Sequence, residues 1–320
     1  MKNLSFKDAF KKTKNNKGFK FPSIEDERFQ DTLLFPLLTP KFKINKNEKV
    51  FTIGSCFARN VEKYLMKDFT LPTLDIDVKD MCPVRSKRGN GILNEFNAGT
   101  ISQRINWAIN NISSSDLKHG LFEDDSGTED FLIPTGNHYP NTKLDTVLEA
   151  RKRIDDVYKN LSNSDTLFLT LGLTESWFDL EHDCYLNSIS PKLIRKKQES
   201  ERFVFVNLDF DTSFNLLSKS FDLALDSGIK KIIVTVSPVP LFKTFTSNDA
   251  VVASSRSKSI LKIVAHKLKD TFKDKIDYFP SYEIVKSGGT SSFLDDNVHV
   301  KDEVVEKVIQ YFINEYVSID

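Results

Sequence analysis

Two short stretches of the sequence combine residue types that can carry out covalent chemistry. Gly54, Ser55 and Cys56 follow one another directly after an apolar run, and late in the chain Asp296 stands three residues before His299. An acidic side chain at that spacing can accept from one imidazole nitrogen, and the other nitrogen can then deprotonate a nucleophile. The two stretches together predict a nucleophile and the base that activates it.

Ser55 and Cys56 compete for the role of nucleophile. A residue on the sharp turn between a strand and a helix is exposed, and the first N–H groups of the helix can bind a developing oxyanion. The positive end of the helix dipole favours a thiolate, which is the reactive form of cysteine. We therefore expect Cys56 to attack, with Ser55 as a neighbouring hydrogen-bonding residue of the site. The alternative for Cys56 is a small buried apolar residue.

The elements that must position these residues are strands and helices in alternation. Nearly continuous apolar runs predict strands that are covered on both faces, as in a parallel sheet, over residues 48–55, 165–173 and 230–240, and a fourth strand with its exit over 276–285. Helical spacing of apolar residues predicts helices over 57–69, 254–272 and 301–317. The alternation predicts an α/β fold, with a doubly wound parallel sheet in a three-layer α/β/α arrangement.

Polar residues that follow the predicted strands are candidate binding residues, because ligands of an open parallel sheet bind beyond the carboxyl ends of its strands. Besides Gly54 they are Gly172, Thr174, Glu175 and Ser237. Ser257 and Lys258 are expected near the start of a helix, where N–H groups could bind a phosphate or carboxylate. A plain helix cap with a solvated lysine is the alternative for that pair.

Composition and charge limit the kinds of partner that the protein can attract. The 45 basic and 45 acidic residues cancel, so no global field favours nucleic acid or an anionic membrane. Residues 1–20 nevertheless hold seven lysines against one acidic residue. We expect residues 1–45 to form a basic, solvated arm, and residues 46–320 to form one domain with a largely helical insertion at about 70–163. The acidic stretch at 123–130 is interpreted as a solvated turn of that insertion.

Cysteine usage and hydropathy indicate the compartment. The three cysteines, Cys56, Cys82 and Cys184, include no Cys-x-x-Cys pair, which argues against a disulfide framework and against a structural zinc site. No apolar stretch reaches the ~20 residues that span a bilayer, and the N-terminus lacks the apolar region of a signal peptide. A cytoplasmic protein is therefore expected.

The stretch Gly54-Ser55-Cys56-Phe57-Ala58 resembles the signature of the GSCFA family. Further blocks resemble the family pattern in the same order: LTLGLTESW (169–177), VTVSPVPL (234–241), SRSKSIL (255–261), YFPSYEI (278–284) and DDNVH (295–299). The family is similar to the SGNH/GDSL hydrolase superfamily. That resemblance implies a flavodoxin-like α/β/α fold.

The resemblance also implies roles for single residues. The first block of the superfamily is Gly-Asp-Ser, and its third residue is the nucleophile. Aligning Gly54 with the glycine of that block places Cys56 at the position of the nucleophile and Ser55 at the position of the aspartate. The Asp-x-x-His block matches Asp296 and His299 in full. The Gly-x-Asn-Asp block matches only at Gly172, because Thr174 and Glu175 replace its Asn and Asp. The second conserved block of that superfamily contributes a glycine to the oxyanion hole. The candidates for that block in this sequence are Asn97 and its neighbours Asn94 and Gly99.

The implied function is that of an O-acyltransferase or an esterase, acting through a Cys-His-Asp site on a carbohydrate-linked or other O-acyl group. No metal and no required cofactor is expected, although acetyl-CoA or another acyl donor could be a co-substrate. The insertion could exclude water as a lid. The alternatives are a catalytically inactive CoA- or sugar-nucleotide-binding protein of polysaccharide biosynthesis, and an assembly protein that docks through its basic arm.

Overall fold

The core of the protein is a four-stranded parallel sheet. The computed structural model describes residues 4–77, 89–125, 127–134, 143–195 and 201–318. The strands are β3 (Val50–Gly54), β6 (Thr166–Leu171), β10 (Lys231–Val236) and β11 (Ile276–Phe279), in the spatial order β11-β10-β6-β3. All three pairings are parallel. The mixed α/β class and the parallel sheet predicted from the sequence are confirmed.

The direction of the chain across the sheet reverses at β3. After β3 the chain returns to the outer edge of that strand, where Thr70 forms a parallel bridge with Lys49. It then crosses to β6 on the other side of β3 and continues to β10 and β11. In this architecture such a reversal usually places the ligand site in a crevice between the loops that leave the carboxyl ends of the two strands. We therefore expect the crevice beyond Gly54 and Leu171.

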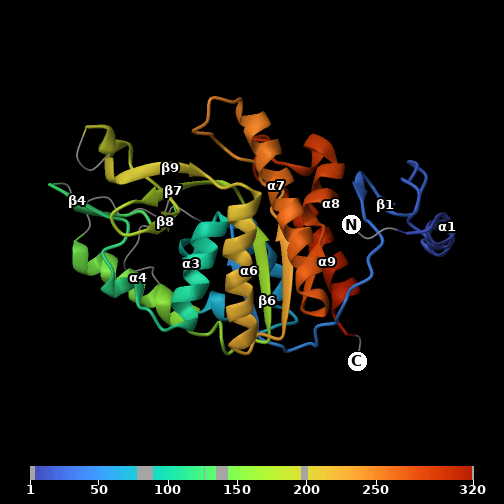
Figure 1. The fold of residues 1–320 in the computed structure, drawn as a ribbon, viewed down its shortest axis with the longest axis horizontal. Coiled ribbons are helices and arrows are strands. Elements are labelled where there is room, and N and C mark those ends of the chain that lie inside the picture. Colours follow the sequence, from blue (N-terminus) through green and yellow to red (C-terminus); the bar gives the residue numbers. More distant parts are fainter. Residues whose placement is uncertain (1–3, 78–88, 126, 135–142, 196–200, 319–320) are drawn as a thin grey trace.

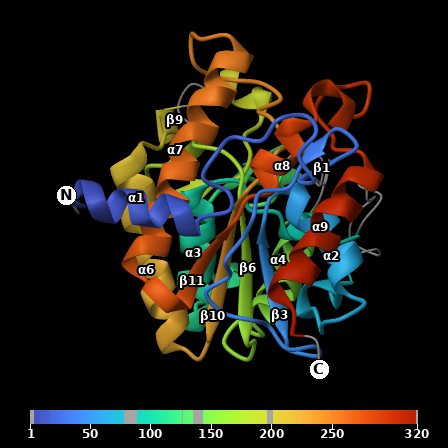
Figure 2. The same cartoon turned by 90° about the vertical axis from the view of Figure 1, so that its right-hand side faces the viewer.

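Helices cover both faces of the sheet (Figure 2). One face packs against α3 (Ala98–Ile109), α4 (Leu144–Tyr158), α6 (Phe210–Asp226) and α7 (Ala250–Thr271). The other face packs against α2 (Cys56–Leu65), α8 (Ser281–Ser287) and α9 (Asp302–Tyr316). Short 3-10 turns complete the described helices: η1 (Pro72–Leu74), η2 (Gly89–Leu93), η3 (Ser114–Asp116), η4 (Pro191–Arg195), η5 (Lys273–Lys275) and η6 (Gly289–Ser292).

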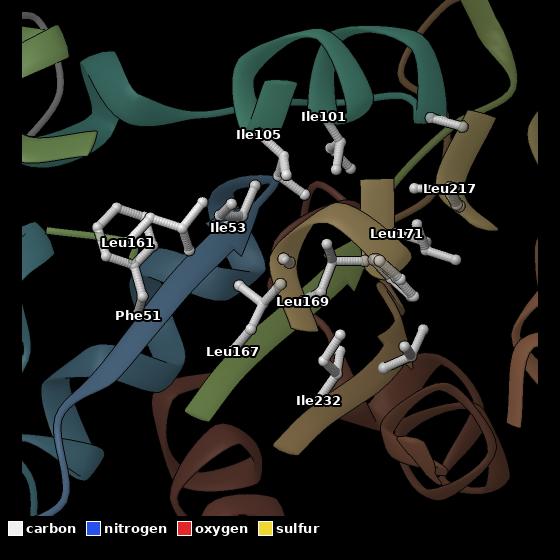
Figure 3. Close-up of a cluster of buried hydrophobic side chains, with 14 of the residues drawn as sticks. Phe51, Ile53, Ile101, Ile105, Leu161, Leu167, Leu169, Leu171, Leu217 and Ile232 are labelled. Carbon is white, nitrogen blue, oxygen red and sulfur yellow. The ribbon is translucent and has the colours of Figure 1, made fainter. Parts of the chain in front are cut away.

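Alternate residues of the central strand supply the two halves of the core. Leu167, Leu169 and Leu171 of β6 face the cluster that includes Ile101 and Ile105 of α3 (Figure 3). Phe168 points to the opposite face, where its ring packs edge-on against Phe312 of α9 at 5.3 Å. Both faces of the strand are thus buried, which explains why its sequence is a continuous apolar run.

The segment interpreted as an insertion contributes directly to the core, since α3 and α4 pack on the sheet through Ile101, Ile105 and Ile154. Its acidic stretch is not a solvated turn. It forms a hairpin of β4 (Leu121–Asp124) and β5 (Gly127–Asp130). Asp130 is buried there because the guanidinium of Arg151 donates to both of its carboxylate oxygens.

A second sheet, which we did not predict, stands beyond the carboxyl edge of the first. It consists of β7 (Glu175–Asp179), β8 (Cys184–Leu186) and β9 (Phe203–Asn207), paired antiparallel in the order β8-β7-β9. The stretch 276–285, predicted as a strand and its exit, contains β11 up to Phe279, and the helix α8 begins at Ser281.

The N-terminal arm has two parts. The helix α1 (Phe6–Asn15) has no buried residue and stands apart from the body of the molecule (Figure 1). Farther along, β1 (Phe29–Gln30) pairs with β2 (Leu33–Leu34), and Leu33, Phe35 and Ile44 are buried in the core. In the described residues, no helix combines the length and the apolar character that crossing a membrane requires.

Candidate active site

The turn between β3 and α2 requires a glycine. Gly54 has a φ of 144°, a conformation that side chains with a Cβ rarely adopt. A Cβ atom at this position would lie 2.4 Å from the carbonyl oxygen of Thr170 on the neighbouring strand β6. The bare backbone thus lets β3 and β6 stay close together up to the point where the crevice opens.

Ser55 and Cys56 begin the helix that follows. Ser55 is the N-cap residue of α2, yet its side chain does not cap the helix. Its hydroxyl oxygen is buried and has no hydrogen-bond partner among the described residues. Cys56 is the first residue of α2 and is half-buried. The first-turn N–H groups of α2 are not engaged by the cap side chain, so the helix start presents its positive end toward the crevice.

A buried polar network fixes α2 on the sheet. Glu62 of α2 accepts hydrogen bonds from Arg59 at 2.6 Å and from Thr73 at 2.6 Å. Thr52 of β3 also donates to Glu62, and the guanidinium of Arg59 donates to the carbonyl oxygen of Thr52 at 2.9 Å. Because this network ties the helix to its own preceding strand, it sets the position of the cysteine.

Gly172, directly after β6, packs closely against Ser55 and Phe96. A Cβ atom on Gly172 would lie 2.6 Å from the carbonyl oxygen of Phe96 and 3.3 Å from the Cβ of Ser55. The close approach of these three segments explains the need for glycine here. The structure therefore brings Gly54, Ser55 and Gly172 together, as the sequence led us to expect.

Thr174, which replaces the asparagine of the Gly-x-Asn-Asp block, uses both of its donors within the protein. Its hydroxyl donates to Oδ1 of Asn207 at 2.8 Å, and its backbone N–H donates to Oγ of Ser257 at 2.9 Å. Both donors are committed to neighbouring loops. Asn207, at the end of β9, was not singled out from the sequence, because that strand lies 33 residues farther along the chain.

Asn94 and Asn97, the two asparagines considered for the oxyanion hole, have different surroundings. Asn97 is the N-cap of α3, and its side-chain oxygen accepts from the N–H of Thr100 at 2.9 Å. Asn94 forms a bridge with Gly54, and its side-chain oxygen is buried without a hydrogen-bond partner among the described residues. Asn94 therefore lies at the turn that carries Cys56, whereas Asn97 is occupied in capping a helix. Gly99 packs against the ring of Tyr185.

Ser257 and Lys258 do not begin a helix, so the expected anion site at a helix start is wrong for them. The helix α7 begins at Ala250 and is capped by Asp249, two turns earlier. Both residues are buried and point toward the strand ends. Nζ of Lys258 donates to the carbonyl oxygen of Gly172 at 2.6 Å. Burial lowers the pKa of Lys258 to about 7, an effect that Cys56 opposes and Lys286 reinforces.

Glu175 and Ser237 shape the loops around the crevice. The carboxylate of Glu175 accepts from the hydroxyl of Thr244 at 2.6 Å and from the N–H of Phe245 at 3.0 Å. It thereby holds the loop that follows β10. The hydroxyl of Ser237 is buried and accepts from the N–H of Val239 at 3.3 Å. In the described contacts both residues stabilise the walls of the site.

A cavity of about 400 Å³ adjoins these loops. Aromatic rings from the second sheet and from the loop after β10 form one wall, with Trp177 packed edge-on against Phe205 at 5.6 Å and against Phe245 at 4.9 Å. The lining also includes Asn97, Leu173, Glu175, Asn187 and Lys243. The cavity thus combines an aromatic wall with hydrogen-bonding groups. The sequence did not reveal it because its wall is assembled from three distant segments.

Asp296 and His299 form the predicted pair. Nδ1 of His299 lies 2.6 Å from Oδ2 of Asp296, and the other carboxylate oxygen accepts from the N–H groups of Val298 and His299. The hydrogen bond to His299 lowers the pKa of Asp296 to about 2. Both side chains are exposed, the imidazole by 61%.

The helix that follows this pair contacts α2. Asp302, the first residue of α9, forms an ion pair with Lys63 at 3.0 Å through its carboxylate. The carbonyl oxygen of Asp302 accepts from the hydroxyl of Tyr64 at 3.1 Å. Lys63 and Tyr64 lie in the last turn of α2, at the opposite end of the helix from Cys56. These contacts therefore join the start of α9 to the far end of α2.

A second polar cluster lies away from the crevice. Asp179, Glu181 and His182 bring three potential metal ligands within 4.8 Å of one another. The guanidinium of Arg202 donates to both carboxylate oxygens of Asp179, at 2.8 and 2.5 Å. That cation already neutralises the buried carboxylate, so we interpret the cluster as a structural link between β7 and β9.

Comparisons with known proteins identify the family of the chain. No curated protein matches it. Among solved structures, a catalytic mutant of an acetylxylan esterase from Geobacillus stearothermophilus is similar with 13% sequence identity and a TM-score of 0.33, over 86% of this chain and 96% of that chain. The model of the GSCFA family matches residues 49–312, a range that includes both the Gly54–Cys56 turn and the Asp296–His299 pair. The chain therefore belongs to the GSCFA family.

Proposed function

We propose that the protein is an SGNH-like acyl-group enzyme, an O-acyltransferase or an esterase, with Cys56 as its nucleophile. The observation that carries the proposal is the place of Cys56 as the first residue of α2, directly after the glycine turn at Gly54 that ends β3. A nucleophile at that point meets its oxyanion donors on the same helix.

The chemistry follows from these positions. The sulfur of Cys56 attacks the acyl carbon, and the oxyanion that develops faces the first-turn N–H groups of α2. His299, oriented by Asp296, relays a proton to the leaving group. The product is a thioester on Cys56, and transfer to water or to an alcohol completes the reaction. The hydrogen bond between His299 and the reacting group would form in the substrate complex, as is common for catalytic contacts.

The cavity beside the crevice supports a carbohydrate-linked acyl substrate. A flat aromatic wall can pack against the apolar face of a sugar ring, and nearby amide and carboxylate groups can accept hydrogen bonds from the sugar hydroxyls. In the cavity, Trp177 supplies such a ring, and Asn187 and Glu175 supply polar groups. A transferase of this type would take acetyl-CoA or another acyl donor as co-substrate.

The test is the formation of a covalent acyl-protein. The purified chain is incubated with an activated acetyl ester, and the acetylated peptide is identified by mass spectrometry. We expect an acetyl group on the peptide that contains Cys56, with no acetylation there in Cys56→Ala and retained acetylation in Ser55→Ala. Full ester turnover by Cys56→Ala would sink the assignment of the nucleophile.

A second candidate is a catalytically inactive protein that binds CoA or a sugar nucleotide. The committed donors of Thr174 and the exposed ring of His299 favour it, because an active hydrolase needs a free oxyanion donor and a base in contact with its nucleophile. Calorimetric titration with CoA and with a sugar nucleotide distinguishes the two. Tight binding without acyl-protein would favour this candidate.

A further inference from the structure

The helix α1 lies outside the packed body of the protein. It has no buried residue, and it stands apart from the other helices (Figure 1). Its start is fixed locally, because the N–H of Asp8 donates to the hydroxyl oxygen of Ser5 and that hydroxyl donates to the Asp8 carboxylate. Isolated helices shorter than about 12 residues are only marginally stable in water. A helix of 10 residues without buried contacts is therefore expected to gain stability from a surface outside the body.

α1 has an apolar side and a basic side. Phe6 and Phe10 are four residues apart and share the apolar side, where their ring centroids lie 4.6 Å apart. Both rings are exposed. Asp8 is the acidic residue of the helix, and Ser5 engages it at the N-cap. At about 100° of rotation per residue, the lysines all fall outside the side that holds the two rings: Lys7, Lys11, Lys12 and Lys14.

The pattern of α1 continues in the segment that follows it. Large apolar side chains that are more than half exposed recur between residues 4 and 24: Leu4, Phe6, Phe10, Phe19, Phe21 and Ile24. Lysines stand between them, and the ammonium group of Lys20 lies 5.5 Å from the ring centroid of Phe19. Exposed aromatic side chains and lysines thus occur together along this part of the chain.

This combination favours an anionic lipid surface as the partner. An interfacial helix buries its apolar side at the boundary between headgroups and acyl chains, and clustered lysines are attracted to anionic lipids. A soluble polyanion such as nucleic acid would engage the lysines and leave the phenylalanines in water. The chain as a whole is neutral, so the attraction must come from the arm, where residues 1–20 hold seven lysines against one acidic residue.

The end of the arm is attached to the body. The N–H of Leu34 in β2 donates to the hydroxyl oxygen of Ser287 in α8 at 2.8 Å. Phe35 is buried, and its ring packs edge-on against Tyr311 of α9 at 5.0 Å. Because these contacts join the arm to two helices of the domain, binding of α1 to a surface would hold the whole domain there.

We propose that residues 4–24 form a peripheral anchor that binds anionic membrane lipids. Phe6 and Phe10 enter the boundary between headgroups and acyl chains, and the lysines contact the lipid phosphates. The apolar side is short and ions screen the charges, so the binding is reversible and weakens as the salt concentration rises. This anchor is independent of the proposed acyl chemistry, because it uses no residue of the crevice.

The experiment measures sedimentation of the full chain with vesicles of phosphatidylcholine alone and of phosphatidylcholine mixed equally with phosphatidylglycerol. One variant, Phe6→Ser with Phe10→Ser, removes the apolar side of α1. A second variant, Lys7→Gln with Lys11→Gln and Lys14→Gln, removes three charges. Because α1 has no buried residue, neither variant disturbs the packing of the body.

Two matched controls remove comparable side chains from the body. Ile194→Ser with Ile263→Ser removes two exposed apolar side chains. Lys152→Gln with Lys219→Gln and Lys267→Gln removes three exposed lysines. We expect both controls to bind the vesicles as the wild type does. Equal losses in the controls and in the arm variants would overturn the proposal, because the attraction would then be a property of the whole surface.

We expect the wild type to sediment with the anionic vesicles and to be released at high salt. Each arm variant should bind at least about tenfold more weakly. Absence of sedimentation with the anionic vesicles overturns the proposal. A loss in the lysine variant alone also overturns it and indicates a soluble polyanion as the partner. So does a dimer that the phenylalanine variant converts to a monomer in gel filtration, because a second copy would then cover the apolar side. Vesicle binding needs no acyl substrate, so a failure of the proposed acyl chemistry is recognised separately.

Discussion

Nδ1 of His299 lies 2.6 Å from Oδ2 of Asp296, in a loop where the same carboxylate also binds two backbone N–H groups. The aspartate thus fixes both the loop and the imidazole that it presents. Because only two residues separate them, both side chains belong to a single turn, and their hydrogen bond is local. The helix α9 that follows the turn contacts the last turn of α2 through Asp302, which binds Lys63 and Tyr64.

Asp296→Asn should lower acyl turnover about a hundredfold, the lower end of the contribution of general acid–base catalysis. Asparagine keeps an oxygen for the two backbone N–H groups and removes the charge that orients His299. The lowered pKa of about 2 means that Asp296 contributes stability above the unfolded-state value and loses it as the pH falls through about 2. No loss of activity between pH 5 and 9 should therefore trace to this group. Wild-type kcat in Asp296→Asn would contradict the assignment.

Gly54→Ala should destabilise the fold by at least about 3 kcal/mol, because it adds a clash with the Thr170 carbonyl to a strained φ. Gly289→Ala is the matched control. That glycine also has a positive φ, but a Cβ there meets nothing within 4 Å, so a loss of only about 1 kcal/mol is expected. Urea unfolding curves give both values. Equal losses would show that steric contact with β6 has no effect.

Glu62→Gln should cost about 3 kcal/mol, because it leaves the buried guanidinium of Arg59 without its counter-charge. The double variant Arg59→Met, Glu62→Met removes both charges and should recover part of that loss. Thermal unfolding of the two variants, with the surface pair Lys159→Met, Asp156→Asn as reference, measures the difference. A Glu62→Gln loss below about 1 kcal/mol would mean that the network does not hold α2.

Trp177→Ala should raise the KM for a glycan-linked ester about tenfold, equivalent to about 1.4 kcal/mol, and leave turnover of a small activated ester unchanged. The reason is that Trp177 lines the cavity and is not part of the crevice that holds Cys56. Phe178→Ala is the control, because the next residue of β7 points to the other face and packs on Tyr185. An equal loss of activity with both esters would show that the substitution affects the chemical step and not sugar binding.

The elements of the core could be predicted from the sequence because their signals are local. The apolar runs that became β3, β6 and β10 are continuous in the chain, and burial on both faces leaves that pattern. The Gly54 turn and the Asp296–His299 pair are equally local, since each lies within a few residues. Over 276–285 the sequence predicted a strand and its exit. It did not indicate that the exit is the helix α8, whose Ile284 and Val285 pack on the sheet.

The functional surroundings of Cys56 were decided only by the tertiary structure. Lys258 reaches Gly172 across 86 residues, and Thr174 binds Asn207 across 33. No periodicity reports such contacts, because they arise where crossover helices and strand-end loops meet. By itself the sequence determined the family signature, the parallel sheet and the reactive residue types. The fold decided which of those residues face one another, because side-chain partners are set by the path of the chain over the sheet.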